Sequence, residues 1–132
     1  MSRENVEAVR RTYEAFAQDD RRSHLDLFDP FVMFIPLRNF PGRLHYVGGE
    51  GIREYMRELL EVSAKFIERG EEFIEVGDSV VVSVHADGTG KESGTPTEMK
   101  YFVVWTFRGG TVIRLEAFED RADALKAVGL RE

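Results

Sequence analysis

The N-terminal part of the chain carries apolar residues at helical spacing. They recur at separations of three, four and three positions, as Val6, Val9, Tyr13 and Phe16. Positions three and four apart lie on one face of an α-helix, so this stripe predicts a first helix with one apolar side. The segment HLDLF predicts a short second helix, which Pro30 ends because the residue before a proline avoids the helical conformation.

A strand and a long helix are predicted next. The five apolar residues FVMFI, 31–35, indicate a short buried strand, and the glycines and prolines of 36–49 indicate a loop. A third helix is predicted over about 50–69, where Gly70 would end it.

After residue 70 the apolar spacing changes to a period of two, which is typical of strands. Strands are predicted at 71–76, 79–86, 97–107 and 111–119, followed by a short amphipathic helix within 120–130. Helices grouped on one side of a curled antiparallel sheet make an α+β domain. We therefore expect a single domain over 1–132, a cone-shaped sheet wrapped around a long helix, with an apolar pocket inside.

The charge and composition of the chain restrict its partners. The formal net charge is −6, whereas a nucleic-acid binder needs a basic face to displace counterions. No apolar run reaches the roughly 20 residues of a membrane span, and MSRENVEAVRR lacks the apolar segment of a signal peptide. There is no cysteine, and His24, His45 and His85 lack the spacing of a metal-binding pair. We expect a cytoplasmic protein without metal, cofactor, nucleic acid or membrane.

Six segments, taken in order, resemble one known superfamily. They are VRRTYEAFAQDD, LFDPFV, GGEGIREYMREL, GDSVVVSV, PTEMKYFVVWTF and RLEAFEDRADALKAVGL. The chain resembles nuclear transport factor 2-like proteins, and among them the SnoaL-like group that is related to ketosteroid isomerases. The resemblance implies a cystatin-like α-β(2)-α-type cone and a homodimer packed through the outer sheet face. That superfamily includes ketosteroid isomerases, epoxide hydrolases and polyketide cyclases.

The catalytic positions of those enzymes carry other residues here. Ile35 stands where the resemblance places the aspartate base of the isomerases, and Lys100 where it places their protonated aspartate. Tyr13 is one residue from the position of their tyrosine, and a one-residue offset turns a helical side chain by about 100°. Ala117 stands at the last-strand carboxylate position of the hydrolases and cyclases, with Glu119 two residues on. The standard isomerase mechanism is therefore not expected, and no catalytic residue is assigned.

The isomerase register also predicts which strand faces line the pocket. Lys100 and Phe102 would point into the cone, as would Leu115 and Glu119 on the last strand. An inward lysine can serve as a base, a Schiff-base nucleophile or an anion anchor, whereas a lysine at the rim would pair with Glu98 or Glu119. The predicted ligand-contacting residues are Tyr13, Phe16, Met33, Ile35, Tyr55, Lys100, Phe102, Leu115 and Glu119.

Three functions are compatible with this reasoning. The first is a homodimer whose cone binds a small apolar molecule, held by apolar walls and one or two inward polar groups. The second is an isomerase, cyclase or hydrolase that acts on a hydrophobic metabolite through an unorthodox set such as Lys100, Glu119 and Tyr13. The third is a dimeric protein-interaction module whose cone is filled by side chains. The ligand, and whether the loop of 37–47 closes over the pocket, are left open.

Overall fold

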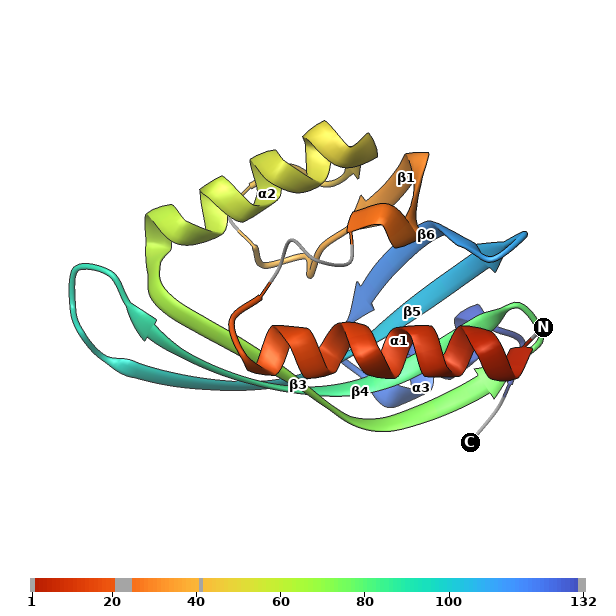
Figure 1. Ribbon diagram of the computed structural model, residues 1–132. Coiled ribbons are helices and arrows are strands. Elements are labelled where there is room, and N and C mark those ends of the chain that lie inside the picture. Colours follow the sequence, from red (N-terminus) through yellow and green to blue (C-terminus); the bar gives the residue numbers. More distant parts are fainter. Residues whose placement is uncertain (1, 21–24, 41, 131–132) are drawn as a thin grey trace.

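The computed structural model describes residues 2–20, 25–40 and 42–130. Within these ranges the chain forms helices on a six-stranded sheet (Figure 1). The elements are α1 (Ser2–Ala17), the 3-10 helix η1 (Leu25–Leu27), β1 (Phe28–Ile35), β2 (Tyr46–Val47), α2 (Gly48–Val62), β3 (Ser63–Val76), β4 (Ser79–Gly90), β5 (Pro96–Arg108), β6 (Thr111–Phe118) and α3 (Arg121–Ala127). None of the described helices combines the length and apolar character that crossing a bilayer needs.

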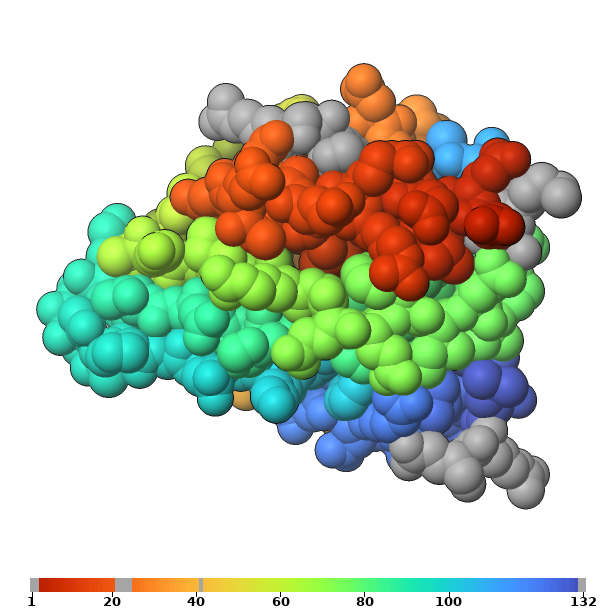
Figure 2. All heavy atoms as spheres, turned by 60° about the horizontal axis from the view of Figure 1, so that its bottom comes forward, coloured from red at the N-terminus to blue at the C-terminus, as the bar shows by residue number. Residues whose placement is uncertain are grey.

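The strands form one curled sheet in the order β2-β1-β6-β5-β4-β3. Neighbouring strands in the described chain run antiparallel except β1 and β6, which run parallel with Met33 opposite Arg114. Figure 1 shows α1 lying inside the curl above β3 and β4, with α2 on the other side of the same hollow. The space-filling view shows α1 directly against β3 (Figure 2). The predicted α+β class and curled sheet are confirmed, with one parallel pair added.

The predicted helix over about 50–69 is divided between two elements, so its last third was predicted wrongly. α2 ends at Val62, and the backbone of Ser63 is already extended, with φ −126° and ψ 126°. From Ser63 onwards β3 pairs with β4, and these strand hydrogen bonds satisfy the backbone groups that further helical turns would have used. Tertiary pairing thus overrides the helical spacing, and it brings Phe66 and Glu68 into the wall of the hollow.

The main core lies between α1 and the concave face of the sheet. Val9 and Tyr13 of α1 belong to one buried cluster with Val82 of β4 and Trp105 of β5, and none of the four is more than 4% exposed. Burial of these apolar side chains is the principal source of stability. It also holds α1 in register with the strands that form the wall of the hollow.

A second, smaller core lies on the convex face, under α3. Ala124 of α3 is buried with Val81 and Val104, and Phe102 and Phe118 pack beside them. In this region both faces of β5 are covered within one chain, which accounts for its apolar residues on both sides. The homodimer expected through this sheet face stays a prediction.

Candidate functional site

A cavity of about 540 Å³ occupies the hollow between the concave sheet face, α1, α2 and the segment after β1. Its wall is mainly apolar and rich in aromatic rings. The aromatic residues among the described lining are Tyr13, Phe16, Phe28, Phe34, Phe40, Tyr55, Phe66, Tyr101 and Trp105. The volume falls within the range of roughly 300–1,000 Å³ that is typical of small-molecule pockets.

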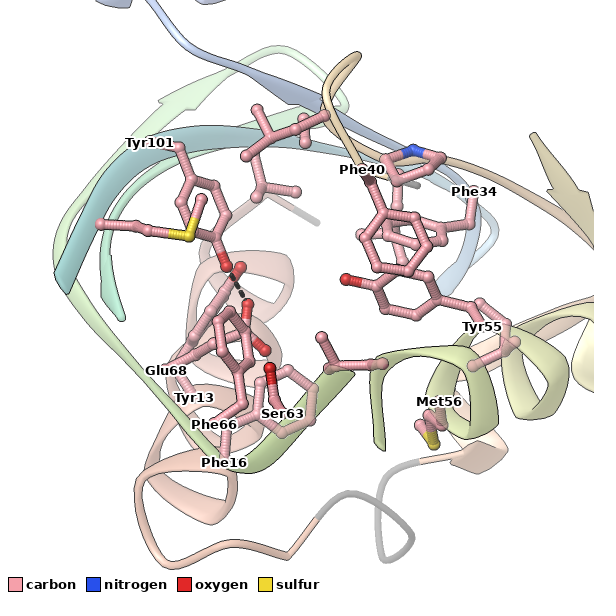
Figure 3. A pocket seen from close by; sticks show the side chains of 18 of the residues that line it. Tyr13, Phe16, Phe34, Phe40, Tyr55, Met56, Ser63, Phe66, Glu68 and Tyr101 are labelled. Carbon is pink, nitrogen blue, oxygen red and sulfur yellow. Dashed lines mark hydrogen bonds between the residues drawn. The ribbon is translucent and has the colours of Figure 1, made fainter. Parts of the chain in front are cut away.

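Side chains from distant parts of the chain face one another across this cavity (Figure 3). One group gathers on α1, β3 and β5, and comprises Tyr13, Phe16, Phe66, Glu68 and Tyr101. The opposing group comprises Phe34, Phe40 and Tyr55. The ring of Tyr55 lies with its centroid 4.5 Å from that of Phe34 and 4.9 Å from that of Phe40. Such close edge-on and tilted contacts make the second group a rigid aromatic wall.

Two hydrogen bonds order the polar groups of the first wall. The hydroxyl of Tyr101 donates to the carboxylate of Glu68, and the indole N–H of Trp105 donates to the hydroxyl oxygen of Tyr13 at 3.1 Å. Tyr101 is 6% exposed and Trp105 is 2% exposed. A buried hydrogen bond is costly to leave unmade, so both pairs fix the orientation of their side chains.

Burial raises the pKa of the Tyr101 hydroxyl well above its ordinary value, and the negative charge of Glu68 raises it further. Both causes disfavour the phenolate, because it would be a buried anion beside a carboxylate. Tyr101 therefore stays protonated across the physiological range and acts as a hydrogen-bond donor to Glu68.

This pKa shift predicts a loss of stability in alkaline solution. The folded chain retains the Tyr101 proton at pH values above about 10, where the unfolded chain releases it. This residue's contribution to the free energy of unfolding is complete below about pH 10 and declines as the pH rises further. Tyr101→Phe should reduce that decline, as measured by urea denaturation of both proteins at about pH 9 and pH 11. Equal declines in the two proteins would contradict the assignment.

The loop of 37–47 forms part of the cavity wall through Leu37, Asn39 and Phe40. Its end is fastened to α2, because the Tyr46 hydroxyl donates to Glu58 Oε1 at 2.8 Å and accepts the Arg43 backbone N–H at 2.9 Å. The basic residues of this loop lie outside the cavity wall: Arg38, Arg43 and His45 are exposed and do not line the cavity.

The structure brings four of the nine predicted ligand-contacting residues to the cavity: Tyr13, Phe16, Tyr55 and Leu115. Binding by these four stays a prediction. Met33 and Ile35 of β1 do not line it, whereas Phe34 and Pro36 do. Val32 is fully buried and Phe31 is 81% exposed, so the inward face of β1 is one residue out of step with the predicted face. A shift of one residue moves every side chain of a strand to the opposite face.

The predicted faces of β5 are also exchanged. Lys100 is exposed on the convex side, opposite His85, and Phe102 packs in the convex core under α3. Glu119 is exposed just after β6 ends. The inward face of β5 instead carries Met99, Tyr101, Val103 and Trp105. Their partners on β4, such as Val84 opposite Tyr101, are buried under α1, and this packing decides which face turns inward.

Sequence reasoning missed the polar pair at the wall, Glu68 and Tyr101. Glu68 lies in the stretch predicted as helix, where a glutamate is expected on the exposed face. Phe66 stands two residues before Glu68, and side chains two residues apart lie on the same face of a strand. A strand prediction would therefore have placed Glu68 beside Phe66. For Tyr101 the signal is the alternation of Met99, Tyr101 and Val103, which share the face opposite to that of Lys100 and Phe102.

One group of possible metal ligands lies on the convex face of β4 and β5. His85 Nε2 is 2.9 Å from Glu98 and 3.8 Å from Asp87, and a donor atom of each residue lies within 4.8 Å of the others. The Arg69 guanidinium is bound to Asp87 at 3.1 Å, which places a cation where a metal would have to compete. Asp87 is therefore already paired with an arginine.

The sequence and the fold were both compared with those of known proteins. A family profile described as "SnoaL-like domain" matches residues 9–115, which is most of the chain. The chain belongs to the SnoaL-like family. The family match agrees with the α+β cone described above.

Solved structures similar to this SnoaL-like domain cover nearly all of it. An NTF2-like protein of unknown function from Burkholderia pseudomallei is 24% identical, with a TM-score of 0.78 over 96% of this chain and 98% of that one. TerC, co-crystallised with polyporic acid, is 26% identical, with a TM-score of 0.78 over 95% and 97%. A protein from Catenulispora acidiphila with a ketosteroid isomerase-like fold, in complex with trimethylamine, is 17% identical in sequence. Its TM-score is 0.73, over 94% of this chain and 93% of that one. No curated protein matches significantly.

Proposed function

We propose that this SnoaL-like domain binds a small, largely apolar molecule in its central cavity. The observation that carries the proposal is the aromatic-lined cavity of about 540 Å³, with the Glu68–Tyr101 pair set into its wall. Apolar walls supply most of the binding free energy, and a few fixed polar groups orient the ligand. TerC with polyporic acid and the Catenulispora protein with trimethylamine support small-molecule binding as a use of this fold.

The alternative of a filled cone has less support. A filled cone would need large side chains, such as those of Phe16, Phe34, Tyr55 and Phe102, to occupy the hollow. The first three line an open cavity instead, and Phe102 packs on the opposite face of the sheet. A protein-interaction role would therefore depend on the outer surface alone.

A second candidate function is proton-transfer catalysis on a bound metabolite, of the isomerase or cyclase type. The Glu68–Tyr101 pair favours it, because a carboxylate can act as a general base and a tyrosine hydroxyl can orient it. Mass spectrometry of each ligand after incubation separates the two functions. Unchanged ligand is expected for a binding protein, and conversion that is lost in Glu68→Ala is expected for an enzyme.

Blocking the cavity tests the proposed binding function. Ala117 lines it from β6, so the benzyl group of Ala117→Phe should occupy space that a ligand needs. A ligand found by thermal-shift screening of steroids, terpenoids and polyketide-like acids should bind at least about tenfold more weakly to this variant, by isothermal titration calorimetry.

Lys100→Ala is the matched control for this experiment. It removes an exposed side chain from the convex face, so ligand affinity should stay within about twofold of the original. If the affinity of a ligand is unchanged by Ala117→Phe but is lowered by Lys100→Ala, that ligand binds outside the cavity. The absence of any stabilising compound would favour the interaction module.

A further inference from the structure

The exposure of the cavity wall changes from one end to the other. On the inward face of β5 the lining residues follow one another as Thr97, Met99, Tyr101, Val103 and Trp105. Thr97 is exposed and Met99 is half-buried, whereas Val103 is 6% exposed and Trp105 is 2% exposed. The cavity therefore opens to solvent near Thr97, and its deep end lies near Trp105.

The junction of α2 and β3 lies at the same open end. Val62, the last residue of α2, lines the cavity and is 47% exposed, and Ser63 follows it as the first residue of β3. The register places Phe66 opposite Gly88 and Gly88 opposite Thr97. Ser63 stands three residues before Phe66, and Figure 3 shows the two on the same side of the cavity. The mouth is thus bordered by the end of α2 and the starts of β3 and β5.

Gly88 leaves room for the Thr97 hydroxyl at this mouth. A methyl group on Gly88 would lie 2.9 Å from Thr97 Oγ1 and 3.3 Å from Phe66 Cδ1. The two side chains therefore reach over Gly88 from the neighbouring strands, and a side chain on Gly88 would have to displace them. This arrangement sets a hydroxyl close to an aromatic ring in the wall.

The chemistry of the wall changes in the same direction as its exposure. At the mouth, the hydroxyls of Thr97 and Ser63 carry no charge, and each can donate or accept a hydrogen bond. At the deep end, Leu115 pairs with Trp105 in the sheet, and the ring of Phe28 lies 6.0 Å from that of Trp105 between centroids. A ligand with its apolar part between these side chains and its polar group at the mouth would avoid burying an unpaired polar group.

We propose that the cavity binds amphipathic molecules end-on. Their apolar part lies toward Trp105, and an uncharged hydroxyl or carbonyl group forms hydrogen bonds with Thr97 and Ser63 at the mouth. This orientation rests on the proposed binding function. It adds the direction in which the ligand lies and the chemical class of its polar end.

Two probes of nearly equal shape test the orientation. They are 2-(2-naphthyl)ethanol and 2-propylnaphthalene, in which a methyl group replaces the hydroxyl, and equilibrium dialysis measures their binding to the intact chain. Thr97→Val exchanges a hydroxyl for a methyl group, so affinity for the alcohol should fall about fivefold while affinity for the hydrocarbon stays within about twofold. Ser63→Ala should act in the same direction. The double variant should weaken binding of the alcohol at least about tenfold.

Thr106→Val is the matched control. It makes the same change on β5 at a residue that does not line the cavity, so both affinities should stay within about twofold. If the double variant binds the alcohol as tightly as the original chain, the orientation is overturned and the proposed function stands. A crystal structure of the complex with the hydroxyl toward Trp105 would overturn it as well. If neither probe binds, or if Ala117→Phe leaves both affinities unchanged, the proposed function fails and the orientation fails with it.

Discussion

Replacement of Trp105 by alanine is expected to lower the free energy of unfolding by about 3–5 kcal/mol. Trp105 is 2% exposed, and its ring lies 5.6 Å from Tyr13 and 6.0 Å from Phe28, measured between centroids. Truncation would leave a void where α1, β1 and β5 meet, and it would remove the N–H donor to the Tyr13 hydroxyl. Urea denaturation followed by circular dichroism measures the change.

Two further variants separate the contributions at this position. Trp105→Phe keeps a ring but removes the hydrogen bond to Tyr13, so a smaller loss is expected, of which about 1 kcal/mol comes from that bond. Phe31→Ala removes an aromatic side chain that is 81% exposed, and it should change stability by less than about 0.5 kcal/mol. A Trp105→Ala loss as small as that of Phe31→Ala would mean that Trp105 is not packed as described.

The second large effect is expected at Gly48, where β2 turns into α2. Gly48 has φ +74°, a conformation that costs other residues about 1–2 kcal/mol. A methyl group there would also lie 2.9 Å from the backbone oxygen of Pro30, which cannot swing aside as a side chain would. Gly48→Ala should therefore lower the free energy of unfolding by about 2 kcal/mol or more.

Gly49 offers a control one residue away. Its φ is not in the left-handed region, and a methyl group there would meet only the end of the Arg53 side chain, at 3.6 Å. Since alanine favours a helix over glycine, Gly49→Ala should range from neutral to about 1 kcal/mol stabilising. Chemical denaturation of both variants under the same conditions gives the comparison. Equal effects at the two positions would refute the backbone explanation.

Most of the fold was accessible from the spacing of apolar residues. The stripe Val6, Val9, Tyr13 and Phe16 predicted α1, and the period of two after residue 70 predicted the hairpins of β4, β5 and β6. These signals are strong because each element has one face that must be buried, and burial imposes the period of the element on the sequence.

The spacing of apolar residues does not predict which face of β1 and which face of β5 turns towards the cavity. FVMFI is apolar throughout, and in β5 apolar residues such as Val103 and Val104 occur on both faces. Only tertiary packing distinguishes such faces: α1 covers the concave side and α3 the convex side. The same ambiguity displaced the predicted site, since Lys100 was placed inside and Tyr101 outside. The polar pair of the cavity needs β3 and β5 to approach from positions far apart in the chain.

The parallel pairing of β1 with β6 has a consequence for how the chain is made. Met33 of β1 pairs with Arg114 of β6, which is far away in the sequence. During synthesis β1 therefore leaves the ribosome long before β6 has been made. Until then Val32 and Phe34, which belong to the folded core, have no β6 residues to pack against. Contacts this distant in sequence slow folding, because the loop must close before any stabilisation is gained. During that interval the nascent chain exposes an apolar strand, which makes β1 prone to aggregation until β6 has been made.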